Sequence, residues 1–261
     1  MKIFQENSLI KEKLDISKDL FLLKFATCQK NIKIVPGQFI NIKVNETLTP
    51  FLRRPFSIFD FDGKIITIIF KVRGSGTKIL SEKNINSKVD IIFPLGNGFK
   101  KIFDIKEGIW FVAGGVGFAG LFYAFKKLNN TKNKFFIGFN KLTEANPIFN
   151  FLKNYNNINI SVMEKQKKFF KGTVLELVKK NLKYEKPKII AGCGPFEMLK
   201  ELYKLAKENK IETEFLFEKI MGCGLGLCYS CAIKIYKNNQ IKYLLTCKDG
   251  PVFSGDEIVW D

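Results

Sequence analysis

Four cysteines near the C-terminus have the type and spacing of a metal-binding motif. They follow the pattern Cys-x₄-Cys-x₂-Cys-x₁₅-Cys at Cys223, Cys228, Cys231 and Cys247. A C-x₄-C-x₂-C…C spacing is that of plant-type 2Fe–2S proteins, in which four thiolates hold two irons. Gly224 and Gly226 in the first loop suit the tight turns that such a loop needs. The spacing therefore predicts a 2Fe–2S cluster bound by these four side chains.

Two alternatives use the same cysteines. A structural zinc site usually has paired C-x₂-C knuckles, and here only Cys228 and Cys231 form one. Disulfides would also suit four cysteines, but nothing else in the sequence points to an oxidising compartment. The chain has no histidine, which excludes His-ligated zinc fingers, Rieske clusters and Ser–His–Asp triads. Cys28 has no motif around it and is expected to fill the core.

The arginines form a second group of candidates. Arg53, Arg54 and Arg73 fall in one short stretch, and the other 40 of the 43 basic residues are lysines. Since the guanidinium is a rigid bidentate fork for phosphate that lysine cannot copy, this clustering indicates a phosphate site. Chance clustering of a rare residue is the alternative.

The residues around these arginines fit a dinucleotide. Arg54-Pro55-Phe56-Ser57 opens a strand, and Gly76-Thr77 stands just before a short helix. An arginine on a pyrophosphate, a serine hydroxyl near a flavin ring and a helix N-terminus aimed at phosphate would form one site. An ordinary turn and helix cap is the competing interpretation.

Two glycine turns form the third group. They are Gly114-Gly115-Val116-Gly117 and Cys193-Gly194-Pro195, and each follows an apolar strand. In a doubly wound sheet both would lie at the carboxyl edge, where this fold binds a pyrophosphate. Cys193 is expected either to be a buried small residue or to lie close to a nicotinamide ring.

The elements that would position these residues change character along the chain. Residues 1–100 predict short strands at 19–27, 37–44, 55–60, 64–72 and 89–93 and one helix at 78–82, which indicates an antiparallel barrel or sandwich. Residues 101–217 alternate strands (109–113, 134–140, 157–163, 188–191, 213–217) with helices (118–128, 144–153, 173–182, and one from 195), which indicates a doubly wound parallel sheet. Residues 218–261 hold the four cysteines and a hairpin near 237–239, and are too small to form a core alone.

The net charge of +18 raises the possibility of nucleic-acid binding. The lysines are scattered, however, and no stripe of basic and aromatic residues appears, so a general lysine bias is the preferred explanation. No apolar run approaches the length of a membrane span, and no signal segment begins at Met1. We expect a cytoplasmic protein that binds neither nucleic acid nor membrane.

At this point the chain resembles a known family. The order R-P-F-S, G-x-G-T, G-G-V-G, C-G-P and a C-terminal cysteine cluster is similar to that of the ferredoxin–NADP reductase superfamily. The tail, with Met221-Gly222-Cys223 and Cys247-Lys248-Asp249-Gly250-Pro251, more closely resembles the electron-transfer subunit of class B dihydroorotate dehydrogenase. The resemblance spans essentially the whole chain.

The resemblance implies a role for each part of the chain. It implies FAD on the barrel, NADH across the second domain, and a 2Fe–2S cluster that exchanges electrons with the FMN of a catalytic subunit, in a heterotetramer of two copies of each subunit. That partner oxidises dihydroorotate to orotate in pyrimidine (UMP) biosynthesis. The FAD contacts would come from Arg54, Pro55, Phe56, Ser57, Ile69, Phe70, Lys71, Gly76 and Thr77.

Some features depart from the family pattern. Many relatives have a proline shortly after the first glycine turn, where this chain has Phe118-Ala119-Gly120. The second parallel strand ends at Asn140-Lys141 without the acidic residue that selects NAD over NADP, so NAD rests on the resemblance. A small flavin subunit of an NADH-dependent ferredoxin:NADP oxidoreductase or of a glutamate synthase-like complex is an alternative. A zinc-stabilised nucleic-acid-binding protein is another.

Overall fold

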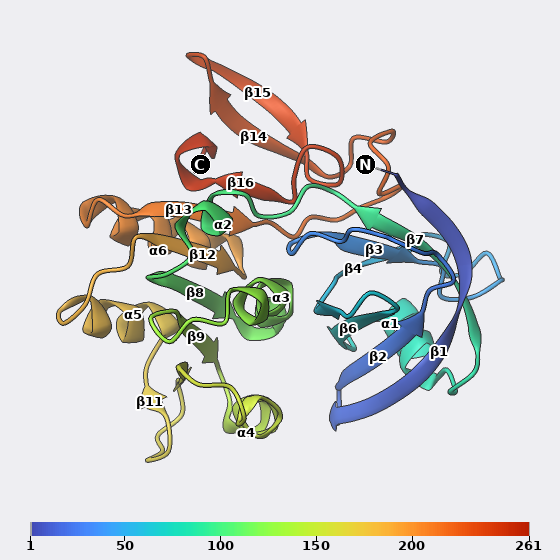
Figure 1. The fold of residues 1–261 in the computed structure, drawn as a ribbon, viewed down its shortest axis with the longest axis horizontal. Helices are drawn as coiled ribbons and strands as arrows, with labels where there is room; N and C mark the ends of the chain where they lie inside the picture. Colours follow the sequence, from blue (N-terminus) through green and yellow to red (C-terminus); the bar gives the residue numbers. More distant parts are fainter. Residues whose placement is uncertain (1, 261) are drawn as a thin grey trace.

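A computed structural model describes residues 2–260. Two seven-stranded sheets lie side by side, and a two-stranded hairpin lies against them (Figure 1). This arrangement confirms the predicted combination of an antiparallel β domain, a doubly wound domain and a small C-terminal cysteine segment.

The first sheet is antiparallel and curls into a partly open barrel, with strand order β4-β3-β7-β1-β2-β6-β5. A buried set of Ile, Leu, Val and Phe side chains fills it, among them Phe25, Ile40 and Phe93. Its elements are β1 (Phe4–Ser17), β2 (Leu20–Ala26), β3 (Phe39–Ile42), β4 (Arg54–Ser57), β5 (Asp60–Phe61), β6 (Ile65–Lys71), α1 (Ser75–Glu82) and β7 (Lys88–Leu95).

Two features of the barrel differ from the sequence prediction. Strand β1 was not predicted, because its side chains are mostly polar and only Ser8 and Ile10 are buried; pairing with β2 and β7 determines it. The single strand predicted at 55–60 is wrong, since it consists of β4 and β5, which stand at opposite ends of the sheet order. The two residues between these strands, Ile58 and Phe59, connect one edge strand of the sheet to the other.

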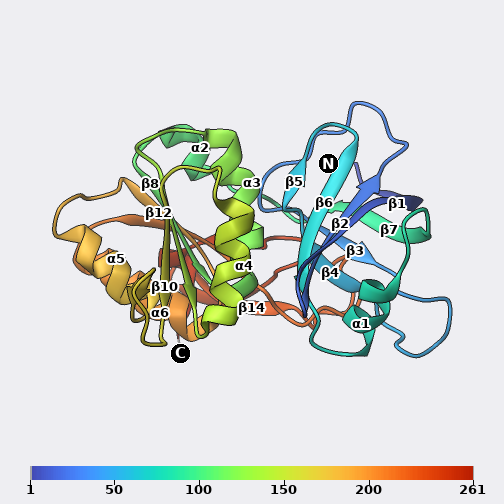
Figure 2. The ribbon, with the colours of Figure 1, turned by 90° about the horizontal axis from the view of Figure 1, so that it is seen from below.

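The second sheet has the order β11-β10-β9-β8-β12-β13-β16 and is parallel except for β16. Helices α3 and α4 lie between this sheet and the barrel, and α5 and α6 cover the other face (Figure 2). Its elements are α2 (Lys101–Ile105), β8 (Ile109–Gly114), α3 (Phe118–Leu128), β9 (Lys134–Phe139), α4 (Leu142–Leu152), β10 (Ile158–Val162), β11 (Phe170–Lys171), α5 (Val174–Leu182), β12 (Ile189–Cys193), α6 (Phe196–Glu208), β13 (Glu212–Leu216) and β16 (Val252–Ser254).

Local sequence explains most of these elements. Helix α5 begins with the predicted capping box, in which the Thr173 hydroxyl accepts from the Glu176 N–H at 3.1 Å and Glu176 accepts from the Thr173 N–H at 2.7 Å. Helix α2 was missed because its first N–H groups donate to the carboxylate of Glu214, which comes from β13. The prediction that β13 is the last strand is wrong, since β16 pairs with it.

After β13 the chain runs to the barrel, turns beside it and returns as the hairpin β14 (Ala232–Lys237) and β15 (Gln240–Leu245) (Figure 1). The hairpin confirms the predicted turn, and Ile233 and Ile235 pack it against the core of the second sheet. Within residues 2–260, no helix is long and apolar enough to cross a membrane.

Candidate functional site

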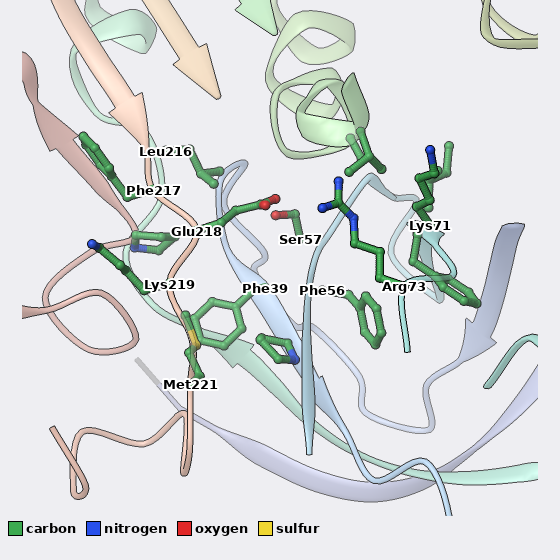
Figure 3. A pocket seen from close by; sticks show the side chains of 16 residues that line it. Phe39, Phe56, Ser57, Lys71, Arg73, Leu216, Phe217, Glu218, Lys219 and Met221 are labelled. Atoms are coloured by element: carbon green, nitrogen blue, oxygen red, sulfur yellow. The ribbon is translucent and has the colours of Figure 1, made fainter. Parts of the chain in front are cut away.

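A cavity of about 250 Å³ opens between the barrel and the second sheet (Figure 3). It brings together most of the residues predicted to contact a flavin. These side chains and the segment that follows β13 line the same cavity. Residues from the barrel and residues from the C-terminal part of the chain therefore form one wall. The lining includes Phe39, Pro55, Phe56, Ser57, Ile69, Phe70, Lys71, Arg73, Val116, Ala119, Leu216, Phe217, Glu218, Lys219, Met221 and Pro251. The mixture of flat apolar walls and a few polar groups fits a flavin ring.

Three polar side chains point toward one another in this cavity: Ser57, Arg73 and Glu218 (Figure 3). Glu218 is an exposed residue of the cavity wall, and the protein atoms around its carboxyl remove part of its hydration. Burial raises the pKa of Glu218, and the positive charge of Arg73 opposes this shift. The site therefore contains one group able to hold a proton above the ordinary carboxyl range.

Arg54 lies against the N-terminal turn of α1. A Cβ added to Gly76 would come within 2.7 Å of the Arg54 Nε, so only glycine leaves the guanidinium room there. The Thr77 hydroxyl accepts from the N–H groups of Arg73 and Gly74, at 2.9 and 3.1 Å. The structure thus brings the Arg54 guanidinium beside a helix N-terminus, and the binding of phosphate there stays a prediction.

Arg53 does not share this cradle. Its guanidinium pairs with the carboxylate of Asp90 and also donates to the Asp90 carbonyl at 3.1 Å, with both side chains mostly buried. The prediction that all three clustered arginines bind phosphate is therefore wrong for Arg53. Its guanidinium instead connects the loop between β3 and β4 to Asp90 of β7.

The strand from Ile69 to Lys71 forms another part of the cavity wall. The Lys71 ammonium leaves the barrel, however, and pairs with Glu144 of α4 at 2.7 Å and with Asp19 at 3.2 Å. The bond to Glu144 raises the pKa of Lys71, which therefore stays charged at neutral pH. Its side chain ties the barrel to the second sheet.

The two glycine turns predicted for a nicotinamide dinucleotide meet at the carboxyl ends of β8 and β12, which are adjacent. A Cβ added to Gly117 would lie 2.6 Å from the Cys193 carbonyl oxygen, and one on Gly194 would lie 3.0 Å from the Gly114 nitrogen. Helices α3 and α6 leave these strands toward opposite faces of the sheet. The turns therefore stand at the topological switch point, where open α/β sheets bind nucleotides.

Cys193 is the buried small residue of the first alternative, and its place near a nicotinamide ring stays a prediction. Its side chain is fully buried, and burial raises the pKa of the thiol well above its usual range. A Cβ added to Gly120 of α3 would lie 3.5 Å from the Cys193 Sγ and 3.3 Å from the Ser57 Oγ. Gly120, in the segment that departs from the family pattern, thus lies where the flavin cavity and the glycine turns meet.

Three of the tail cysteines lie in the loop that precedes β14, where N–H···S hydrogen bonds form, and Cys247 follows β15. The N–H groups of Leu225 and Leu227 each donate to the Cys223 Sγ at 3.3 Å. The Cys223 N–H donates to the Cys228 Sγ at 3.3 Å, and the Ser230 Oγ lies 3.2 Å from the same sulfur. Such donors stabilise thiolates, which are the form that binds iron.

Cys228 interacts with Cys223, and Cys247 interacts with Cys231 and more weakly with Cys223. Hydrogen bonds, the largest from the Ser230 side chain, lower the pKa of Cys228 to about 6. Burial raises the pKa of Cys247 to about 12, reinforced by Cys231. Within residues 2–260, no three His, Cys, Asp or Glu side chains are grouped closely enough to hold a metal ion. Four cysteine thiolates are the donor set of a 2Fe–2S cluster.

The ligand loop is tied directly to the barrel. Asn41 of β3 is fully buried, and its Nδ2 donates to the Cys223 carbonyl at 3.1 Å. Asn97, just beyond β7, donates to the carbonyls of Lys248 and Asp249 at 2.9 and 3.0 Å. Both contacts fix the position of the cysteine loop relative to the flavin cavity.

The remaining cysteine corrects a prediction. Cys28 is exposed rather than part of the core, and its thiol donates to the Glu6 carboxylate at 2.9 Å. This hydrogen bond raises the pKa of Cys28, so the thiol stays protonated. All six cysteines are free thiols, and none forms a disulfide.

Sequence reasoning placed Arg73 in a phosphate site rather than beside the flavin ring, and it missed Glu218, Asn41 and Asn97. Glu218 had one available signal, since it is a charged residue shortly after a buried strand at the carboxyl edge of the sheet. Asn41 and Asn97 had none, because their partners lie more than 150 positions away in the chain.

Comparison with known proteins gives consistent matches. Residues 218–259 match the family model of the iron–sulfur cluster binding domain of dihydroorotate dehydrogenase B. The chain is 35% identical over 233 residues to the dihydroorotate dehydrogenase B (NAD(+)) electron transfer subunit of Caldanaerobacter subterraneus subsp. tengcongensis, covering 88% of this chain and 90% of that one. The Fusobacterium nucleatum subunit of the same name is 31% identical over 268 residues, covering 99% of both.

A solved structure has the same fold over nearly the whole chain. It is a chain of the NADH-dependent reduced ferredoxin–NADP oxidoreductase, with a TM-score of 0.81 and 26% identity over 98% of this chain and 91% of that chain. The barrel, the doubly wound sheet and the C-terminal segment therefore have counterparts in the fold of a protein described for flavin-based electron bifurcation.

Proposed function

The chain belongs to the family of dihydroorotate dehydrogenase B electron transfer subunits, and from this premise we propose how its residues carry electrons between NAD(H) and a catalytic partner. The cofactors of the family are FAD, a 2Fe–2S cluster and NAD. FAD supplies the conversion between two-electron hydride chemistry and single electrons. The proposed partner is a separate subunit that contains FMN and oxidises dihydroorotate to orotate for UMP synthesis.

One observation carries the proposal. The segment from Phe217 to Met221 lines the flavin cavity and runs within two residues into Cys223. The flavin cavity and the cluster loop therefore share a wall, which makes them neighbours in an electron path.

For FAD, Arg54 and the N-terminal turn of α1 at Gly76 and Thr77 would hold the pyrophosphate. Pro55, Phe56, Ser57 and the strand Ile69, Phe70 and Lys71 would form the wall against the ring. Ser57 and Arg73 would orient the reacting edge, and Glu218 would hold a proton there. This assignment leaves Arg53 to its structural ion pair with Asp90.

For the nicotinamide dinucleotide, the turn at Gly114, Gly115, Val116 and Gly117 would accept the pyrophosphate, and Cys193, Gly194 and Pro195 would border the ring. Three of these glycines stand where a Cβ would collide with the facing turn, which supports the assignment. We propose NAD rather than NADP, because the relatives carry NAD(+) in their names, while Asn140 and Lys141 at the end of β9 leave the choice open.

Cys223, Cys228, Cys231 and Cys247 are the proposed iron ligands and would hold a 2Fe–2S cluster as thiolates. The N–H groups of residues 223, 225 and 227 would stabilise the sulfur charge. A zinc-stabilised nucleic-acid-binding protein would need neither the flavin cavity nor the paired glycine turns. The small flavin subunit of a ferredoxin:NADP oxidoreductase shares the fold, but the family membership favours the dihydroorotate partner.

Several finer statements belong to the same proposal. The domains would be an FAD barrel at 1–100, an NAD domain at 101–217 and a cluster module at 218–261. The complex would contain two copies of each subunit. This chain would oxidise NADH but would not act on dihydroorotate by itself. The six free thiols support a reducing, cytoplasmic location.

The test begins with the purified chain and Cys228→Ser. We expect flavin and 2Fe–2S absorption with about two irons per chain. The variant should lose the iron absorption and electron delivery to the FMN subunit, yet keep NADH oxidation by an artificial acceptor. A colourless wild-type protein that contains zinc would overturn the cofactor assignment. Failure of the wild-type chain to bind and reduce a dihydroorotate-oxidising FMN subunit would overturn the partner assignment.

A further inference from the structure

A second cavity, of about 650 Å³, lies away from the flavin site. It opens between the start of β1, the loop from β2 to β3 (residues 27–38) and the segment from β7 to α2 (residues 96–100). None of its lining residues lines the flavin cavity or belongs to either glycine turn. A volume of this size suits a small organic molecule.

Hydrogen bonds between its walls hold this cavity open. Gln38 is 2% exposed; its Oε1 accepts from the Val35 N–H at 2.8 Å, and its Nε2 donates to the Gly96 carbonyl at 2.8 Å. The Phe99 N–H donates to the Pro36 carbonyl at 2.9 Å. The loop from β2 to β3 is therefore fixed to the segment that follows β7, and the cavity has its shape without a ligand.

Four lysines line the cavity, and no acidic residue does. They are Lys2, Lys30, Lys33 and Lys100. Within residues 2–260, none of their four ammonium groups forms an ion pair. Because like charges repel one another, an anion that carries several charges would be attracted to this cavity.

Two carboxylates contact lining residues, and both are occupied by other donors. Glu6 accepts from the Gln29 side-chain amide at 3.1 Å and from the Cys28 thiol at 2.9 Å. Glu214 accepts from the backbone N–H of Lys100 at 3.3 Å and from the next N–H groups of α2. Neither carboxylate pairs with an ammonium group of the cavity, which therefore keeps an excess of positive charge.

The general excess of lysine does not by itself produce such a cavity. Another lysine-rich hollow, of about 420 Å³, lies at the opposite edge of the second sheet from the glycine turns. There Glu107 pairs with Lys132 at 3.2 Å and with Lys188 at 3.9 Å, and Glu185 pairs with Lys134. That hollow is largely neutralised from within, whereas the cavity beside β1 is not.

Part of the lining is apolar, which selects for an organic ligand. Phe4 is half-buried and Phe99 is 2% exposed, and Ile32 and Val35 lie in the same wall. The Lys2 ammonium lies 5.1 Å from the centre of the Phe4 ring, so a cation and an aromatic surface stand together. An aromatic side chain offers a stacking surface to a planar ring. Inorganic phosphate would leave this apolar wall uncovered.

We propose that this cavity binds a nucleoside polyphosphate, with its phosphates on the four lysines and its base against Phe4. The site is separate from the FAD and NAD sites of the proposed function and would be occupied at the same time as they are. An acidic segment of another protein could also meet the lysines, but a closed hollow with buried walls favours a small molecule.

The experiment titrates ATP into the chain by calorimetry. The chain is loaded with FAD and iron and saturated with NAD(+), so that the other nucleotide sites are filled, and about 0.15 M salt screens weak surface attraction. We expect Lys30→Gln/Lys33→Gln to raise the Kd for ATP about tenfold or more. Inorganic tripolyphosphate should bind the wild type about fivefold more weakly than ATP, because it lacks the base and the ribose.

Lys183→Gln/Lys186→Gln is the matched control. Both of its lysines are exposed, form no ion pair with residues 2–260, and have the same spacing as Lys30 and Lys33. The control removes the same charge from the second domain and should change the Kd by less than about twofold. Flavin content, iron content and thermal unfolding should equal those of the wild type in both double variants.

Three results would overturn the proposal and leave the proposed function intact. The first is an equal loss of affinity in the two double variants, which would assign binding to the overall charge of the chain. The second is equal affinity for tripolyphosphate and ATP, which would remove the nucleoside from the site. The third is the absence of ATP binding by the wild type, and binding of polyglutamate in its place would assign the cavity to an acidic protein segment.

Discussion

The side-chain amide of Asn41 donates a hydrogen bond to the backbone carbonyl of Cys223 across 3.1 Å. Asn41 lies on β3 opposite Pro55 of β4, the strand proposed for the flavin, and Cys223 is the first proposed iron ligand. A single buried side chain therefore joins the wall of the flavin cavity to the cluster loop. The Asn41 Oδ1 has no partner, so the contact with Cys223 is the one that this amide makes in the described chain.

Replacement of Asn41 by alanine should loosen the cluster loop. The Cys223 carbonyl would lose its buried donor, at a cost of about 1–2 kcal/mol in the free energy of unfolding. We expect a chelator to bleach the iron absorption faster than in the wild type. Asn159→Ala is the control, because Asn159 makes an equally long bond to a backbone carbonyl far from the tail. Equal bleaching rates in the two variants would contradict the positioning role of Asn41.

The neighbouring arginines should separate stability from flavin binding. Arg53→Ala breaks a mostly buried ion pair with Asp90 and should lower the free energy of unfolding by about 1–3 kcal/mol, with FAD retained. Arg54→Ala should leave stability nearly unchanged but release FAD on gel filtration. Urea denaturation and the flavin-to-protein absorbance ratio measure the two effects. Loss of flavin from both variants to the same extent would contradict the assignment of Arg54 to the FAD pyrophosphate.

Glu218 should set a pH dependence. Since burial raises the pKa of this carboxyl, it keeps its proton to a higher pH than an exposed glutamate and loses it as the pH rises through that pKa. When kcat/KM for NADH oxidation by an artificial acceptor is plotted against pH, its value should change as the pH passes this pKa. This limb of the pH profile should be absent from Glu218→Gln. Arg73→Ala should move the limb to higher pH, because the positive charge that opposes the shift is removed. An identical limb in all three proteins would exclude Glu218 as its source.

Gly120→Ala should disturb the contact between the two nucleotide sites. The added Cβ would lie 3.1 Å from a Leu216 methyl carbon and 3.3 Å from the Ser57 Oγ. We expect FAD to remain bound and kcat for NADH oxidation to fall about tenfold to a hundredfold, because small misplacements of reacting groups have large effects on rate. Stopped-flow measurement of flavin bleaching by NADH tests this. An unchanged rate would show that α3 can shift without affecting the reacting groups.

The sequence by itself determined the parts of this protein whose physics is local. Thiolate ligation depends on residue type and short spacing, so Cys223, Cys228 and Cys231 could be recognised within nine positions. Periodicity and capping likewise predicted α3 over Phe118–Leu128 and α5 from Thr173, because a helix selects residues three and four positions apart. The glycine turns followed from strands that end where this fold binds phosphates.

Only the tertiary structure decided which of the similar residues act in the site. Arg53 and Arg54 are adjacent in the chain, yet their side chains have different partners. The Arg53 guanidinium pairs with Asp90, whereas the Arg54 guanidinium lies beside the N-terminus of α1. Helix α2 depends on the carboxylate of Glu214, and the cluster loop depends on Asn41. The partners in these last two contacts are separated by more than a hundred residues, so no local pattern records them. Folding brings β3 and the tail together because Phe39 is buried in one cluster with Met221, Cys231 and Cys247.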